Sequence, residues 1–493
     1  MVTNKIVAEN IRSGHPRGLI CTTDFYYAKV GNMLLKAAES SGVRLSNNEL
    51  YRAVLRITLY FEDIICDSGV WHGFVNKHQA LYNKPLPFYT ISEDYYYDEP
   101  HEEDIRLLIW LTLVEVNPTE YPHPEKEEIM VLARNFYQVL DNEFEQAPIN
   151  EDLKRFFQEA KFMNDYITVR DVMLWTMIGC YLNDHKDYDD IIDDELDHVS
   201  QRTQLEEDDP RTMYSAMTQL MFKYKVGPLA LFPKEWLSLM MEANGNDAAA
   251  EALRKIEYRD IDVYLLDKSD DTYIYLRSTD DNVIAVRKDG YADLENKDLK
   301  EGMGCVAAFV RFNGEWNPNG MDSWGRLGQH FNEVKEHRKL YRDGFSEKHF
   351  KSLMKKTGGS PLVYLGNGDA TRRFLMDDIG IPEHLMQESR LFEEKNIVAW
   401  VPNCNEGPFF SYGLTSTICD ERNPFYVKDE KGDDSLELIA NPELSQDDMA
   451  QYLIENHMVP DAAFDDRHGK ERGRQLAQEN LDFIARCYRR RYY

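Results

Sequence analysis

Residues 51–82 constrain the fold more than any other stretch of the chain, because they combine a largely buried helix with a sharp change of direction. Apolar side chains cover most of the helical surface over residues 54–65, and four charged side chains fall on one narrow stripe: Arg52, Arg56, Asp63 and Asp67. Gly69 can supply the positive φ that ends such a helix. We therefore expect the N-terminal region to pack around this helix.

The end of this helix offers a first candidate site. Asp67 precedes Trp71 and His72, which we expect at a compact corner before a second short helix that ends by Pro85. Burial beside a carboxylate can move the pKa of a histidine across neutrality. Asp67, Trp71 and His72 are therefore candidate catalytic residues. The alternative is ordinary packing with a satisfied hydrogen bond.

The periodicity of the apolar residues predicts an α+β fold in three regions. Helical spacing runs through residues 1–250, which predicts a mostly helical N-terminal domain. Residues 258–325 alternate with a period of two between turn-forming segments, which predicts a small antiparallel, barrel-like β module. Residues 326–493 combine both patterns and predict a mixed α/β C-terminal region.

Composition limits the classes of partner. The 493 residues exceed what one core accommodates, and the formal net charge of −30 opposes binding to nucleic acid or to anionic membranes. The longest apolar run, residues 105–116, is too short to cross a bilayer. Seven scattered cysteines without a CxxC pair, and an N-terminus without a secretory pattern, predict a cytoplasmic protein.

An acidic segment, residues 184–209, contains a candidate metal site. It carries 12 acidic side chains against two basic ones, which is typical of a solvated face or a linker. Asp194 and His198 lie one helical turn apart, and Glu195 with His198 forms one E-x-x-H pair of the kind used in carboxylate-bridged metal sites. Such sites need a second pair, which the sequence lacks.

A second candidate metal set lies in the predicted helix over residues 327–356. His330, Glu333 and His337 share one helical face, and two imidazoles with a carboxylate are a zinc-type ligand set. The spacing is not that of the more specific HExxH motif. Lysines and arginines surround the set, so a solvated helix face is the alternative.

The β module suggests a partner. Tyr273 and Tyr275 point to one face of a predicted strand, and Trp316 and Trp324 follow nearby, so an aromatic groove for a peptide is one interpretation. Cross-strand pairs that only stabilise the sheet are the other. The basic C-terminal tail, residues 467–493, can dock on an acidic surface or form an ordinary terminal helix.

Two stretches resemble a known family. They are YFEDIICDSGVWHGFVNKHQALYNKPLPFY at residues 60–89 and GPLALFPKEWL at residues 227–237. They are similar to a bacterial family catalogued only as a domain of unknown function, and the likeness covers most of the chain. The resemblance implies a bacterial cytoplasmic protein and assigns no activity or catalytic residue.

No phosphate-binding loop, nucleophile elbow or calcium loop is present in the sequence. We therefore expect a protein-interaction or scaffold role, with a protein or peptide partner. The alternative is a metal-assisted hydrolase with its site in the helical domain or at the domain interface. No cofactor is predicted apart from a divalent metal in that alternative, and the sequence does not define the oligomeric state.

Overall fold

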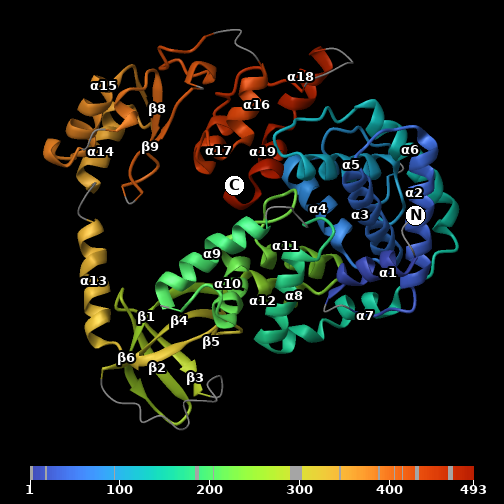
Figure 1. Ribbon diagram of the computed structural model, residues 1–493, viewed down its shortest axis with the longest axis horizontal. Helices are drawn as coiled ribbons and strands as arrows, with labels where there is room; N and C mark the ends of the chain where they lie inside the picture. The colour runs from blue at the N-terminus through green and yellow to red at the C-terminus, as the bar shows by residue number, and fades with distance from the viewer. Residues whose placement is uncertain are drawn as a thin grey trace. The chain divides into compact units, whose positions relative to one another are not determined.

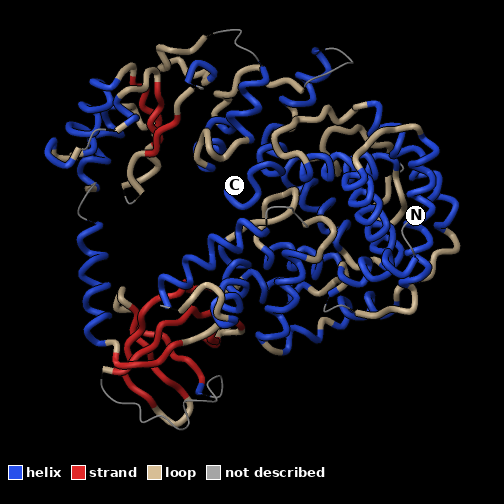
Figure 2. Tube along the Cα trace, viewed as in Figure 1, coloured by secondary structure: helices blue, strands red, loops and turns tan. Residues whose placement is uncertain are grey.

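A computed structural model gives the fold of the chain (Figure 1). It describes residues 4–16, 19–93, 95–183, 188–203, 205–288, 302–342, 346–386, 389–404, 406–413, 415–427, 432–464 and 470–493. The chain divides into two compact units, Met1–Phe331 and Asn332–Tyr493, which are described separately. Helices dominate the first unit up to residue 254, and the strands gather in two sheets (Figure 2). The α+β class is confirmed, whereas the predicted boundaries between three regions stay a prediction.

The N-terminal helices of the first unit form one packed group. Their bounds are α1 (Asn4–Ser13), α2 (Asp24–Ser41), α3 (Asn47–Cys66), α4 (Val70–Tyr82), α5 (Glu102–Val116), α6 (Glu127–Phe144), α7 (Glu151–Glu159), α8 (Tyr166–Ile178), α9 (Tyr188–Thr203), α10 (Pro210–Lys223), α11 (Pro233–Ala243) and α12 (Asp247–Arg254). In Figure 1, α3 lies among α1, α2 and α5, and α3 packs directly on each of them. The expected central helix is therefore present.

The start of α3 follows from a capping box. The Ser46 side chain accepts from the backbone N–H of Glu49, and the Glu49 carboxylate accepts from the backbone N–H of Ser46. Asp67, with a φ of 50°, is the residue that caps the C-terminal end of α3. Gly69, with a φ of 92°, does not end α3 but precedes the first residue of α4. The expected corner at Trp71 and His72 is therefore wrong, since both lie in the first turn of α4.

A buried carboxylate explains why α4 begins so soon. Oδ2 of Asp63 accepts a 2.7 Å hydrogen bond from the backbone N–H of Trp71, and Oδ1 accepts one from the N–H of Val70 at 3.3 Å. These are N–H groups of the first turn of α4, which otherwise lack helical partners. Tyr181 OH donates to the same carboxylate at 2.8 Å. Asp63 therefore joins α3, α4 and the segment after α8.

The β module of the first unit contains six strands in the described residues. Their bounds are β1 (Glu257–Ser269), β2 (Tyr273–Ser278), β3 (Val283–Arg287), β4 (Met303–Phe312), β5 (Glu315–Pro318) and β6 (Ser323–Arg326). The order is β1-β2-β3-β5-β4-β6, and a further pairing of β1 with β4 closes a ring of strands. Ile274, Leu276 and Phe309 are buried inside it, and Tyr273 and Tyr275 remain half-buried on the other face.

Hydrogen bonds of the segment between β5 and β6 help to attach the β module to the helices of its unit. Asn319 Nδ2 donates to the backbone carbonyl of Thr218 at 2.9 Å, and Tyr166 OH donates to Asn319 Oδ1 at 2.7 Å. The backbone N–H of Met321 donates to Ser215 Oγ at 2.9 Å. The module therefore belongs to the same compact unit as α8 and α10.

The second unit is mixed. Its elements are α13 (Gly328–Arg342, which begins in the first unit), α14 (Glu347–Lys356), β7 (Leu362–Leu365), α15 (Gly368–Arg373), η4 (Phe374–Ile379, a π-helix), β8 (Ile397–Trp400), β9 (Phe409–Ser411), α16 (Gly432–Ala440), α17 (Asp447–Glu455), α18 (Lys470–Gln478) and α19 (Leu481–Arg489). The three strands form an antiparallel sheet, and Leu365 of β7, Ile397 of β8 and Phe374 of η4 share one hydrophobic core.

Two charged segments have ordinary structural roles where they are described. In the acidic segment, α9 buries Leu196 and Val199 against Ala216 of α10. In the basic tail, Arg489 is 1% exposed and donates to the backbone carbonyls of Leu438 and Ile439, among other acceptors. No helix in the described part of the chain is both long and apolar enough to cross a membrane.

Candidate functional site

The connection between α1 and α2 brings three ligand-type side chains together. After the end of α1 at Ser13, Gly14 passes close to α3, where an added Cβ would lie 2.7 Å from a methyl group of Leu59. His15 follows at once, and Asp24 is the first residue of α2. Cys21 lies between them, and its backbone N–H donates to Asp24 Oδ2 at 3.3 Å. This hydrogen bond holds Cys21 beside the first turn of α2.

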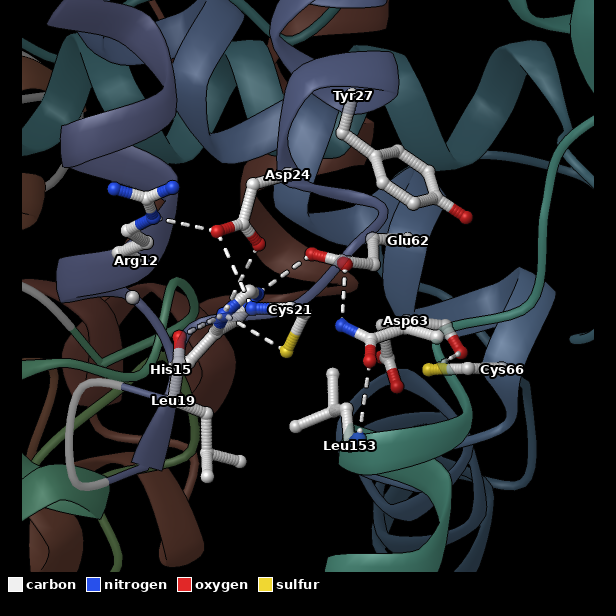
Figure 3. A network of polar contacts seen from close by, with 12 residues as sticks. Arg12, His15, Leu19, Cys21, Asp24, Tyr27, Glu62, Asp63, Cys66 and Leu153 are labelled. Carbon is white, nitrogen blue, oxygen red and sulfur yellow. Dashed lines mark hydrogen bonds and ion pairs between the residues drawn. The ribbon is translucent and has the colours of Figure 1, made fainter. Parts of the chain in front are cut away.

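His15, Cys21 and Asp24 form a compact buried cluster (Figure 3). Nδ1 of His15 lies 3.9 Å from Cys21 Sγ and 4.0 Å from Asp24 Oδ1, and the three ligand atoms all lie within 4.8 Å of one another. The residues are only 2%, 4% and 0% exposed, respectively. Among the side chains that the structure describes, this is the one place where three metal-type ligands converge.

Surrounding groups orient the cluster. His15 Nε2 lies 2.8 Å from Glu62 Oε2, and Glu62 Oε1 accepts from Asn150 Nδ2 at 2.7 Å. On the other side, Arg12 Nε donates to Asp24 Oδ2 at 2.6 Å. These contacts leave Asp24 Oδ1 buried and without a hydrogen-bond partner among the described residues. This carboxylate oxygen faces the thiol and the imidazole, and it forms a long ion pair of 4.0 Å with His15 Nδ1.

The cluster holds a proton strongly. Burial alone would lower the pKa of His15, but its hydrogen bonds to Cys21 and Glu62 outweigh that effect and raise the pKa to about 10. His15 is therefore an imidazolium at neutral pH, held between Glu62 and the Cys21–Asp24 pair. The site stabilises positive charge at the position of Nδ1.

The same geometry fits a tetrahedral metal ion. Ligand atoms on one zinc ion lie roughly 3.5 Å apart, so the three side chains need only a small inward movement. Metal-bound histidines usually donate their second ring N–H to a carboxylate, which is the place that Glu62 occupies at Nε2. Thiolate, imidazole and carboxylate together are ligands typical of zinc. The backbone oxygen of Leu19, 3.3 Å from His15 Nδ1, is a fourth candidate ligand.

The predicted catalytic residues lie elsewhere, at the start of α4. Trp71 is 1% exposed, and its ring packs against Tyr60 and Phe74. His72 stacks on Tyr97 with ring centroids 3.6 Å apart, and its Nδ1 lies 3.8 Å from Asp67 Oδ1. The structure thus brings Asp67 and His72 together and turns Trp71 into the core, and a catalytic role for them stays a prediction.

The predicted metal residues of α9 do not form a ligand cluster with each other. Asp194 is exposed, and Nε2 of His198 lies 3.4 Å from Asp260 Oδ2 of β1. Lys223 contacts both Asp260, at 2.9 Å, and Glu195, at 2.7 Å. Its ammonium group disfavours a second cation at this point. The contacts join α9 and α10 to the β module.

The predicted set on α13 is described only in part. His330 is half-buried and Glu333 is exposed. The side chain of His337 lies outside the described residues. A role for His330, Glu333 and His337 in metal binding therefore stays a prediction.

Sequence reasoning missed the His15 cluster entirely. His15, Cys21 and Asp24 are six and three positions apart, which is no established metal motif, and Glu62 follows 38 positions after Asp24. The available signal was the density of ligand-type residues between two short helical patterns. That signal is weak, because only the fold shows that these three side chains are buried.

Comparisons with known proteins give a family and no activity. A family model described as "Protein of unknown function (DUF3843)" matches residues 6–278 and 329–490, well over half of the chain. This confirms the resemblance inferred from the sequence. The match contains His15, Cys21, Asp24 and Glu62, and it leaves out the strands β3 to β6. No curated protein and no solved structure matches the chain.

Proposed function

Since the chain belongs to the DUF3843 family of proteins of unknown function, we propose a function from its own side chains: it binds a divalent transition metal ion, zinc by ligand type, through His15, Cys21 and Asp24. The buried Oδ1 of Asp24 carries the proposal. A buried carboxylate oxygen without a hydrogen bond costs free energy, which the His15 imidazolium 4.0 Å away offsets only in part. A cation bound directly to the oxygen removes that cost.

The charges around the cluster support a divalent ion. With a thiolate at Cys21, the site carries negative charge on Cys21, Asp24 and Glu62. The guanidinium of Arg12 and one divalent cation together carry the same amount of positive charge. The ion would replace two protons, one on His15 Nδ1 and one on the Cys21 thiol. The exchange leaves the net charge of the buried site unchanged, so it avoids the large cost of burying an unbalanced charge.

The enclosure of the ligands favours a structural role over hydrolysis. A hydrolase needs a path for substrate to the ion, and all three ligand side chains are less than 5% exposed. An ion at this place would join the α1–α2 connection, through His15 and Glu62, to α3. We therefore propose a metal-stabilised scaffold protein, with the expected protein or peptide partner binding elsewhere on the chain.

The thiols are consistent with a cytoplasmic setting. All seven cysteines are free, and burial raises the pKa of Cys66, Cys180 and Cys305. A bacterial cytoplasm, in which thiols stay reduced, is therefore part of the proposal.

The proposal is tested by elemental analysis of the full chain, purified without chelator and without a polyhistidine tag. We expect zinc equimolar with the protein. Cobalt substituted for zinc should give the ligand-field and thiolate charge-transfer absorption of a tetrahedral site with one sulfur ligand.

Two variants complete the test. Cys21→Ser should abolish the charge-transfer band and most of the bound metal, whereas Cys419→Ser, which removes an exposed thiol, should retain both. Circular dichroism of each variant checks that it is folded. A metal-free protein that takes up neither zinc nor cobalt when folded would overturn the proposal.

A further inference from the structure

A second feature of the first unit, separate from the metal cluster, is an apolar groove between the α1–α2 connection and α7. The groove has a volume of about 500 Å³, and its apolar lining consists of Leu19, Ile20, Phe156 and Phe162. Phe156 of α7 and Phe162 of the 3-10 turn η2 (Lys161–Asn164) stack with ring centroids 5.1 Å apart. Apolar surface that is ringed by polar residues marks a site of interaction.

Ile20 is the most prominent part of this surface. Its side chain is 75% exposed, more than that of any other large apolar residue in the described part of the chain. The backbone is held on both sides of it. The carbonyl oxygen of Leu19 lies 3.3 Å from His15 Nδ1, and the N–H of Cys21 donates to Asp24 Oδ2. An apolar side chain on a fixed backbone loses little freedom on binding, so Ile20 is suited to anchor a partner.

The open shape of the groove indicates a macromolecular occupant. Arg155, Glu159 and Lys161 of its lining are exposed, as is Ile20. A small-molecule site encloses most of its ligand, and a lining this exposed does not. A protein surface, in contrast, can cover the whole groove.

The charged side chains around the groove are balanced. Asp152 and Glu159 are matched by Arg155 and Lys161. Glu159 pairs with Lys161 at 2.6 Å, but such an exposed pair contributes little and can exchange partners. The whole chain has a formal charge of −30, so two copies repel one another overall. That repulsion is smallest where two neutral surfaces meet, so the groove suits a second copy of the chain.

We propose that this groove is the interface of a homodimer with twofold symmetry. Asp152 lies four positions before Phe156 and Lys161 five positions after it, and both line the groove. A twofold axis near Phe156 makes the two α7 helices antiparallel and places Asp152 of each copy opposite Lys161 of the other. Ile20 of each copy packs on the apolar lining of the other. The expected protein partner is then a second copy of the chain, bound without any of the three metal ligands.

Analytical ultracentrifugation of the full chain tests the proposal. The unmodified protein should have the mass of a dimer at high concentration. Ile20→Asp should raise the dissociation constant of the dimer at least roughly tenfold, because it places a charge against an apolar surface. Val427→Asp, at another exposed apolar residue, should leave the constant unchanged, and circular dichroism checks that both variants are folded. Equal constants in the two variants would overturn the proposal. An unmodified protein that is monomeric at every concentration would also overturn it and would assign the groove to a different protein.

Charge reversal tests the twofold arrangement. Asp152→Lys places lysines opposite one another across the axis, and Lys161→Asp places aspartates there, so each variant alone should dimerise several-fold more weakly. An equimolar mixture of the two variants restores both contacts between opposite charges. Its mixed dimer should therefore be about as stable as the dimer of the unmodified protein. A mixture that dimerises as weakly as its two components would overturn the proposal.

Discussion

Nε2 of His15 lies 2.8 Å from Oε2 of Glu62, so a residue of the α1–α2 connection and a residue near the C-terminal end of α3 share a buried hydrogen bond. The contact fixes the orientation of the imidazole and directs Nδ1 toward Cys21 and Asp24. Any cation that binds at Nδ1 is thereby connected to the central helix.

Replacing Glu62 with glutamine should weaken zinc binding about 10- to 100-fold, which is the usual effect of losing a carboxylate behind a ligating histidine. The amide keeps an oxygen for His15 Nε2 but loses the negative charge. Competition with a chromophoric chelator measures the affinity. Glu143→Gln is the matched control, because Glu143 is also buried but contacts Tyr26 instead. Equal zinc affinities in both variants would contradict the prediction.

Asp104 should make the protein less stable as the pH rises. Burial raises its pKa to about 8, although hydrogen bonds from Tyr60 and Tyr95 partly oppose the shift. The folded state then keeps a proton that the unfolded state releases above its ordinary pKa of 3.8. The free energy of unfolding should therefore fall between about pH 4 and pH 8, by at most roughly 1.4 kcal/mol per pH unit.

Asp104→Asn removes this titration, so its stability should depend less on pH than that of the unmodified protein. Urea unfolding at pH 5, 6, 7 and 8 measures the difference. Asp98→Asn, at an exposed carboxylate, should behave like the unmodified protein. An Asp104→Asn protein with an unchanged pH dependence would show that this carboxyl group is ionised in the folded state.

Gly227→Ala should destabilise the first unit. Gly227 has a φ of 71°, and an added Cβ would lie 2.0 Å from Asn183 Oδ1 and 2.8 Å from the Trp236 ring. Gly245 has a similar φ of 73° with open space around it, so Gly245→Ala is a control for backbone strain alone. Thermal unfolding should show Gly227→Ala less stable than the control by roughly 1–3 kcal/mol. Equal losses would mean that the loop moves freely away from Asn183.

Arg489→Met should loosen the second unit. The buried guanidinium donates to Ser445 O at 2.8 Å and to Asp447 at 3.0 Å, as well as to carbonyls near the end of α16. Removing it leaves several buried acceptors unpaired, at a cost of roughly 3–5 kcal/mol. Hydrogen exchange should accelerate in α16, α17 and α19 and stay unchanged in α3. Arg474→Met, at an exposed residue, should change neither region.

Much of the fold was predictable because periodicity reports burial. The apolar face of α6 and the alternation of β2 follow directly from one-sided packing. Helix starts were less predictable. Asp165 caps α8, because its side chain accepts from the N–H of Thr168, whereas Thr168 itself is also a residue of a type that caps helices. A capping interaction depends on which acceptor the backbone presents, and several residues near a boundary qualify.

The candidate site was not predictable for a different reason. The sequence predicted metal sites at His198 and His330, because acidic residues lie near each of them at helical spacing. The cluster around His15 depends instead on three side chains near one another in the chain being buried together, with Glu62 contributed by α3 from far along the chain. Long-range burial leaves no local pattern. The charged stripe of α3 was visible in the sequence. The sequence did not show that Arg56 lines a cavity whereas Asp63 binds the start of α4.

The side chains of α3 also limit how that helix can be seated. A helix with an almost uniformly apolar surface can turn about its axis and still bury a comparable area. In α3, Arg56 reaches α5, Tyr60 donates to Asp104, and Glu62 reaches His15. Rotation by even one residue would separate each of these buried groups from its partner, at a cost of several kcal/mol in total. The polar minority of the helix therefore selects one orientation among several that hydrophobic packing alone would accept.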